Sequence, residues 1–337
     1  MTIVEAAPGI TGGVDTHLDK HVAAALDPLG RLVGTESFNV DAAGYKALLI
    51  WLEEFGQVTK VGVEGTGSYG VGLSRFLRRK GVEVVEVNRP NRQSRRNQGK
   101  SDPLDAVEAA RAAISGRASG AGKTKDGPVE AIRVLVVAKR SARQARVKAI
   151  VQMRHLGITA PDQLHSRLKG LTVAALVAEA AKLRSTRSSD PVTAATKASL
   201  SSLAHRIQGL DRELAELDEK IESLLLATAP DLLARFGVGP DTAASLLVAA
   251  GDNPERLHSE AAWAHLCGVS PVPADSGKSA GHLRRHDGGD RQANSAVAHR
   301  HGADRSRPRD HRLFRSPSEG RTDQAGRHPD PPALHRP

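Results

Sequence analysis

Residues 12–38 read GGVDTHLDKHVAAALDPLGRLVGTESF, and this stretch decides the fold of the N-terminal part of the chain. It holds three short runs of small, β-branched or apolar residues separated by polar segments of turn length: Gly12 to Asp15, His21 to Leu26 and Leu32 to Phe38. Runs of this kind with turns between them predict an antiparallel meander of three strands.

The segments that follow alternate between helical and strand patterns. A helix is expected from Ala42 to Phe55, because its apolar residues recur at helical spacing. The other expected elements are a strand at Lys60 to Glu64, a helix at Val71 to Arg79, a strand at Glu83 to Val87 and a helix that starts near Asp102. The order β-β-β-α-β-α-β-α is typical of an α/β fold of the ribonuclease-H-like kind.

Composition narrows the class of protein. The chain has 337 residues, enough for two or three domains, and no apolar run approaches the roughly 18 residues that a membrane helix needs. The segment from Met1 to Ile10 lacks the features of a secretory signal, and the single cysteine, Cys267, cannot form an internal disulfide. We therefore expect a protein of the reducing cytoplasm with no membrane partner. Its net charge of +10 favours a polyanionic partner.

Four segments are expected along the chain. Residues 11–118 form the α/β domain, residues 119–228 a basic helix and a coiled-coil region, and residues 229–297 a mostly helical C-terminal domain. Residues 298–337 contain nine Arg, five His and six Pro but no Lys, Ile or Val. Such a composition cannot form a core, so disorder is predicted there.

The middle region carries two patterns. A long helix is expected from Pro128 to about His155, and its basic residues, which include Arg140 and Arg143, form either a solvated face or a contact with a nucleic-acid backbone. Further on, apolar residues are spaced alternately by four and three: Leu203, Ile207, Leu210, Leu214, Leu217, Ile221 and Leu224. This seam predicts an antiparallel helical hairpin or a dimeric coiled coil, with packing inside one subunit as the simpler alternative.

A glycine turn, Gly237-Val238-Gly239-Pro240, precedes an apolar helix that runs to Ala250. Helix-hairpin-helix modules use such a turn to hold a phosphate on backbone N–H groups at a helix N-terminus. An ordinary connection between two helices also uses glycines. Gly237 and Gly239 are therefore either contacts for nucleic acid or residues of an ordinary helix–helix connection.

Four carboxylates stand where this fold would bring metal ligands together. Asp15 ends the first expected strand, Glu64 ends the fourth, and Asp102 and Asp105 lie on one face at the start of a helix. Hard oxygen ligands of this kind hold Mg²⁺, and paired ions promote phosphoryl transfer. Taken singly, Asp102 could be a helix N-cap and Asp105 a partner of the helix dipole.

The turn after Glu64 also satisfies a dinucleotide-binding pattern, because Gly65, Gly67 and Gly70 are followed by Glu86. Three strands precede it, whereas a dinucleotide fold would open with it, so nucleotide binding is the weaker interpretation. The basic run ahead of Asp102 offers candidate phosphate contacts: Arg89, Arg92, Arg95, Arg96 and Lys100.

A second candidate site lies in the loop from Val272 to Ser279. Gly277-Lys278-Ser279 is not a phosphate loop, because the earlier glycine that the motif requires falls on Val272. From the residues alone, Ser276 is either a turn residue or a nucleophile, and Lys278 is a candidate contact for nucleic acid.

These motifs, in this order, resemble the insertion-sequence 110 family of bacterial transposases over about residues 12–295. The matching pieces are Gly13-Val14-Asp15 with His17 and Lys20, Glu64-Gly65-Thr66-Gly67-Ser68-Tyr69, Val87-Asn88-Arg89-Pro90, Lys100-Ser101-Asp102 with Asp105-Ala106, Gly237-Val238-Gly239-Pro240, and Gly268-Val269-Ser270-Pro271 through Asp287-Gly288-Gly289-Asp290-Arg291-Gln292-Ala293-Asn294. The resemblance implies a RuvC-like domain whose Asp15, Glu64, Asp102 and Asp105 bind Mg²⁺, a coiled-coil region and a C-terminal transposase domain. In that domain Ser276 would attack DNA and form a phosphoserine intermediate.

The resemblance also implies partners. Such proteins act as homo-oligomers on the DNA of element ends and target, with a structured guide RNA, so we expect the protein at the bacterial nucleoid. The leading hypothesis is an RNA-guided, Mg²⁺-dependent transposase. A structure-selective nuclease of the Holliday-junction type and an inactive nucleic-acid-binding remnant are the alternatives.

The end of the sequence departs from the family. Relatives continue with a helical segment that contains leucine and lysine, whereas this chain has the Arg/His/Pro tail. A shift of reading frame near Ala296 to His299 would produce such a tail in a GC-rich gene. This change would leave the C-terminal domain truncated and this copy inactive.

Overall fold

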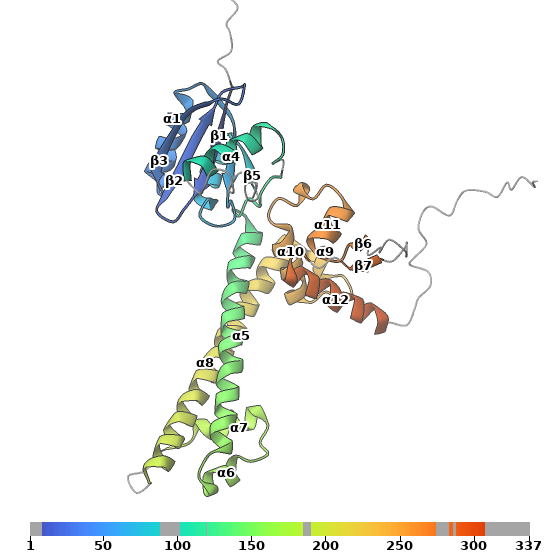
Figure 1. Ribbon diagram of the computed structural model, residues 1–337. Helices are drawn as coiled ribbons and strands as arrows, with labels where there is room; N and C mark the ends of the chain where they lie inside the picture. The colour runs from blue at the N-terminus through green and yellow to red at the C-terminus, as the bar shows by residue number, and fades with distance from the viewer. Residues whose placement is uncertain are drawn as a thin grey trace, which may run out of the picture.

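The computed structural model describes residues 9–87, 102–118, 120–184, 190–273, 283–285 and 288–306. They form a sheet domain, a long helical hairpin and a group of short C-terminal helices beside the junction of the first two (Figure 1).

A mixed five-stranded sheet forms the N-terminal domain. Its strands are β1 (Gly9–Thr16), β2 (Lys20–Leu26), β3 (Leu32–Asn39), β4 (Gln57–Glu64) and β5 (Glu83–Val87), in the spatial order β3-β2-β1-β4-β5. The β1–β2 and β2–β3 pairs are antiparallel, whereas β1–β4 and β4–β5 are parallel. The predicted meander and the predicted order of helices and strands are confirmed.

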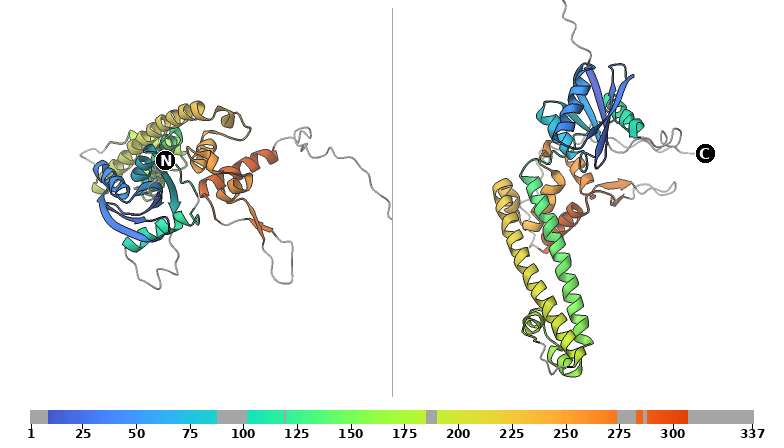
Figure 2. Two further views of the ribbon diagram at one scale, coloured as in Figure 1. Left: turned by 90° about the horizontal axis from the view of Figure 1, so that it is seen from above. Right: turned by 90° about the vertical axis from the view of Figure 1, so that its left-hand side faces the viewer.

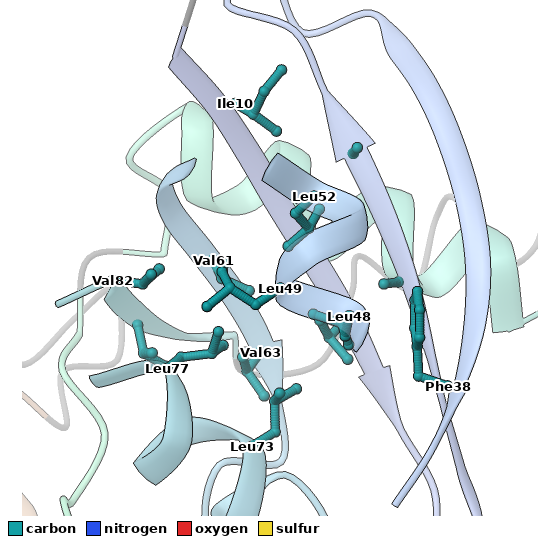
Figure 3. Close-up of a cluster of buried hydrophobic side chains, with 14 residues drawn as sticks. Ile10, Phe38, Leu48, Leu49, Leu52, Val61, Val63, Leu73, Leu77 and Val82 are labelled. Carbon is teal, nitrogen blue, oxygen red and sulfur yellow. The ribbon is translucent and has the colours of Figure 1, made fainter. Parts of the chain in front are cut away.

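Helices cover both faces of the sheet. Helices α1 (Ala42–Glu53) and α2 (Val71–Arg79) pack on one face, where Leu48, Leu52 and Leu77 meet apolar strand residues in a buried cluster (Figure 3). Helix α4 (Asp102–Ile114) lies on the other face. Helix α1 ends before the expected Phe55, and Gly56 then turns the chain with a φ of 144°.

The hairpin consists of two long antiparallel helices, α5 (Pro128–Ile158) and α8 (Pro191–Thr228), which lie side by side in every view (Figures 1 and 2). Short helices α6 (Asp162–Leu168) and α7 (Val173–Ala181) join them at the end far from the sheet. Ile207, Leu217 and Ile221 of the expected seam are buried inside the chain, whereas Leu203, Leu210, Leu214 and Leu224 are half-buried. The expected antiparallel hairpin is present, and packing within one subunit accounts for the three buried positions of the seam.

Short elements make up the C-terminal domain. They are α9 (Pro230–Leu233), α10 (Pro240–Ala250), the 3₁₀ turn η1 (Pro254–Arg256), α11 (Glu260–Leu266), the two-stranded ribbon β6 (Pro271–Pro273) and β7 (Leu283–Arg285), and α12 (Arg291–Ser306). Ala249, Cys267 and Ala293 form a buried cluster between α10, α11 and α12. Among the described residues, no helix combines the length and the apolar character of a membrane span.

Helix α12 corrects one expectation. The composition predicts disorder from Ala298 onward, but the helix continues to Ser306. Ala293 and Ala296 on its first turns are buried, and Ala293 packs in one cluster with Ala249 and Cys267. The start of α12 is therefore held by the rest of the C-terminal domain. The rest of the tail, residues 307–337, lies outside the described residues.

Candidate metal centre

Two glycines bring α4 into direct contact with the sheet. Gly13 of β1 and Gly62 of β4 are register partners on adjacent strands. A Cβ atom at Gly13 would lie 2.2 Å from the Ala106 carbonyl oxygen, and one at Gly62 would lie 2.5 Å from the Ala109 carbonyl oxygen. Any side chain at these positions would push the helix away, so the two glycines set how closely α4 approaches β1 and β4.

The close packing of α4 on the sheet determines where the four candidate carboxylates lie. Asp15 and Glu64 follow the two glycines by two positions, so they lie on the same face of the sheet as α4. Asp102 and Asp105 occupy the first turn of α4. Asp15 is 6% exposed and Asp105 is 3% exposed, so two carboxylates are buried at the end of β1.

The charges of three carboxylates, Asp15, Asp102 and Asp105, interact at this end of the sheet. Burial raises the pKa of Asp15, the nearby His17 lowers it, and the charges of Asp105 and Asp102 raise it again. The structure thus brings Asp15, Asp102 and Asp105 together at the N-terminus of α4. Glu64 ends the neighbouring strand, and its backbone carbonyl accepts a hydrogen bond of 2.8 Å from the Thr16 hydroxyl, which joins the ends of β1 and β4.

His17 belongs to this cluster, although the sequence patterns did not single it out as a site residue. Its Nε2 atom lies 3.1 Å from Oδ2 of Asp15 and 3.5 Å from Oδ1 of Asp102. One ligand atom from each of these three residues lies within 4.8 Å of the others. The signal was its position two residues after Asp15, which places both side chains on one side of an extended chain.

The donors fit a divalent cation. Carboxylate oxygens are the ligands that hard cations such as Mg²⁺ prefer, and imidazole is accepted by several transition metals. A buried Asp15 that faces two further carboxylates is disfavoured in its charged form, and a bound cation would remove that repulsion. The donor set of Asp15, His17 and Asp102 therefore suits a divalent metal ion.

The glycine-rich turn after Glu64 has contacts that oppose nucleotide binding. Gly65 has a φ of 69°, and its carbonyl oxygen accepts hydrogen bonds from the Ser68 and Gly70 amides. Glu86, which a dinucleotide site would need for a ribose, accepts a hydrogen bond of 2.6 Å from the Thr66 hydroxyl. The Thr66 side chain therefore already binds the carboxylate that the motif would use for the ribose.

The basic face of α5 divides into paired and unpaired residues. Lys139 is buried and ion-paired with Asp218 and Asp241, and Arg143 lies 3.1 Å from Asp241. Within the part of the chain that the structure describes, Arg140 has no ion pair. Arg140 and Arg143 line a cavity of about 320 Å³ between α5, α10 and α12.

The other candidate contacts are placed only in part. Gly237 has a φ of 75°, and Gly239 is the N-cap of α10. Asp241 in the first turn of α10 already interacts with Lys139, so a carboxylate stands near the N–H groups that the sequence assigned to a phosphate. The remaining candidates lie outside the described residues: Arg89, Arg92, Arg95, Arg96, Lys100, Ser276 and Lys278.

Comparison with known families identifies the chain. Residues 12–156 match the DEDD family model of IS110, which is described as a transposase, and residues 230–310 match a model described as the transposase IS116/IS110/IS902 family. The chain belongs to the IS110 family of transposases. The second match includes all of α12, so the IS110-family transposase retains family character beyond Ala298. No curated protein matches the chain.

Proposed function

We propose that this transposase cleaves and rejoins DNA with Mg²⁺ bound by Asp15, Glu64, Asp102 and Asp105. The main support for this proposal is that the buried Asp15 lies close to Asp102 and Asp105, where α4 packs directly on β1. The strand order β3-β2-β1-β4-β5, with an antiparallel meander followed by parallel strands, supports a ribonuclease-H-like, RuvC-like domain.

Asp15, Asp102, Asp105 and His17 have separate tasks in this mechanism. Bound Mg²⁺ would stabilise negative charge on the attacking and leaving oxygens of the phosphodiester. Asp15 and Asp105 provide buried oxygens at the base of the site, and Asp102 provides a more exposed one. His17 contacts both Asp15 and Asp102, so it holds the two carboxylates in position beside the DNA.

The resemblance to the family supports Ser276 as the nucleophile. Its Oγ atom would attack the phosphorus, and a base would accept the serine proton. The bond from phosphorus to a deoxyribose oxygen would break, and that oxygen would take up a proton and leave as a DNA hydroxyl. The product is a phosphoserine ester, which a DNA hydroxyl later attacks to restore the serine. Partners of this reaction are DNA at the element ends and target, a guide RNA and further copies of the chain, in the bacterial cytoplasm at the nucleoid.

Substitution of single carboxylates tests the metal assignment. We expect Asp15→Asn and Asp105→Asn to abolish Mg²⁺-dependent cleavage of element-end DNA while DNA binding remains. Asp190→Asn, at an exposed helix cap far from the sheet, is the control and should retain cleavage. Full cleavage by Asp15→Asn would contradict the proposal.

A suicide DNA substrate tests the serine. A covalent adduct at Ser276, absent in Ser276→Ala, is the expected result. Mg²⁺-dependent cleavage without an adduct would instead favour a structure-selective nuclease. DNA binding without cleavage, together with recovery of activity after restoration of the reading frame in the tail, would favour an inactive remnant.

A further inference from the structure

Residues 120–127, which we call the strap, connect the sheet domain to α5 and are bound along their length. On the side of the sheet domain, the Glu86 amide donates to the Gly120 carbonyl at 3.0 Å, and the Arg78 guanidinium donates to the Gly122 carbonyl at 3.4 Å. The Lys125 ammonium donates to the Gly67 carbonyl. The strap is thus fixed to the turn that directly follows Glu64.

The other side of the strap is bound to the loop after α10. The Asn253 side chain accepts a hydrogen bond of 3.2 Å from the Thr124 amide and donates one of 3.1 Å to the Gly122 carbonyl. Asn253 is buried, with 7% of its surface exposed. Both polar atoms of this side chain are therefore used to hold a segment about 130 residues away in the sequence.

Residues next to α5 and α10 cap the other helix across this junction. The N-cap of α5, Gly127, has no side chain, and the first-turn amides of Val129 and Glu130 donate instead to the Asp252 carboxylate at 2.7 and 3.1 Å. In return, the Lys123 ammonium donates to the Val248 carbonyl near the end of α10 at 2.6 Å. A carboxylate at a helix N-terminus and an ammonium at a C-terminus both have the favourable sign for the helix dipole.

Close packing fills the junction. A Cβ atom at Gly122 would lie 2.6 Å from the Thr66 hydroxyl, and one at Gly127 would lie 2.3 Å from the Asp252 carboxylate. Gly251 has a φ of 87°, and a Cβ atom there would lie 2.9 Å from the Lys123 side chain. The three glycines allow the strap to lie directly between the two domains.

We propose that Asp252 and Asn253 are positioning residues for transposition, because through the strap they hold the C-terminal domain in one arrangement on the domain that carries the metal centre. The chain of contacts runs from Glu64 through Thr66 and Gly67 to the strap and then to Asn253. The inference rests on the proposed function, since it assigns the two domains to one reaction. A displacement of about 1 Å in such an arrangement can reduce a rate about 100-fold.

Distance measurements on the full chain test the arrangement. Spin labels at Lys46→Cys on α1 and Glu260→Cys on α11 use exposed positions of the two domains, and the native Cys267 is buried. The variants are Asp252→Ala, Asn253→Ala and the conservative Asp252→Asn, which keeps a capping oxygen. The matched control is Asp190→Ala, because Asp190 caps α8 through the Val192 and Thr193 amides at the far end of the hairpin.

We expect one narrow distance distribution in the unsubstituted chain, in Asp190→Ala and in Asp252→Asn, and a broad one in Asp252→Ala and Asn253→Ala. DNA cleavage should fall about 10- to 100-fold in the two broadened variants, with the Mg²⁺ concentration for half-maximal rate unchanged. Unchanged distributions in these variants, equal broadening in Asp190→Ala, or broadening with full cleavage would overturn the proposal. Failure of the unsubstituted chain to bind metal or cleave DNA would count against the proposed function, while the distance distributions would still test the junction.

Discussion

His21 is a fully buried histidine on β2 whose ring stacks on Tyr45, with 5.8 Å between ring centroids and 9° between ring planes. Neither ring nitrogen has a hydrogen-bond partner among the described residues. Burial, aided by the charge of His17, lowers the pKa of His21 from 6.5 to about 4. The folded state therefore requires the neutral ring.

This residue makes stability depend on pH. Between pH 6.5 and about 4 the unfolded chain binds a proton at His21 that the folded chain does not, so its contribution to stability is complete above pH 6.5 and is lost as the pH falls toward 4. The loss amounts to about 3 kcal/mol. We expect His21→Phe to remove this part of the pH dependence. Urea unfolding at pH 7.5, 6 and 4.5 measures it, and parallel profiles for both proteins would show that His21 does not cause the loss.

At the scale of elements, the contact between α4 and the sheet decides whether the carboxylates meet. Gly13→Ala places a methyl group against the α4 backbone, so we expect the helix to shift and the affinity for Mn²⁺ or Mg²⁺ to fall at least about 10-fold, with a loss of a few kcal/mol in stability. Gly12→Ala is the control, because its Cβ would meet the end of the Leu52 side chain at 3.0 Å on the opposite face. Metal titration followed by calorimetry compares the two. Equal affinities would show that the approach of α4 does not set the site.

The same element shows what sequence could and could not predict. Strand and helix patterns predicted the order of elements through α4, because apolar periodicity is a local property. The partners of β1 follow from the crossovers, so the sequence predicts that carboxylates gather at the end of that strand. Spacing alone could not show that Gly13 and Gly62 are neighbours, since their pairing depends on the register of two strands far apart in the sequence.

Some residues of the candidate site and of the junction could not be assigned a role from the sequence. The sequence places His17 in a family motif but assigns it no role, because one histidine near a strand end has many ordinary explanations. Its two short distances to carboxylates make it part of the cluster. Asp252 and Asn253 carry no pattern at all, because their partners belong to a segment far away in the chain. The long helix α8 was predicted from its seam, but α6 and α7 were not, since they are short and lack strong periodicity.

For the whole molecule, the net charge of +10 predicts nucleic-acid binding. The ion pairs indicate which basic side chains remain available to contact phosphate. Arg140 has no ion pair among the described residues, whereas Arg143 pairs with Asp241 and Arg146 with Asp211. We expect Arg140→Ala to reduce the affinity for duplex DNA and to lower the salt dependence by about one phosphate contact. Arg143→Ala should change the salt dependence less. Fluorescence anisotropy at several salt concentrations measures both slopes, and a larger change for Arg143→Ala would reject this assignment.

Helix α5 is a single helix of 31 residues, about 46 Å long, and it carries α6 and α7 at its far end. Asp252 holds the first turn of α5, so a tilt of the helix would pivot at the junction with the strap. A tilt of about 5° at Gly127 would swing the tip by about 4 Å. A displacement of α6 and α7 would therefore act through α5 on the strap, which lies beside the turn that follows Glu64 and the candidate metal centre.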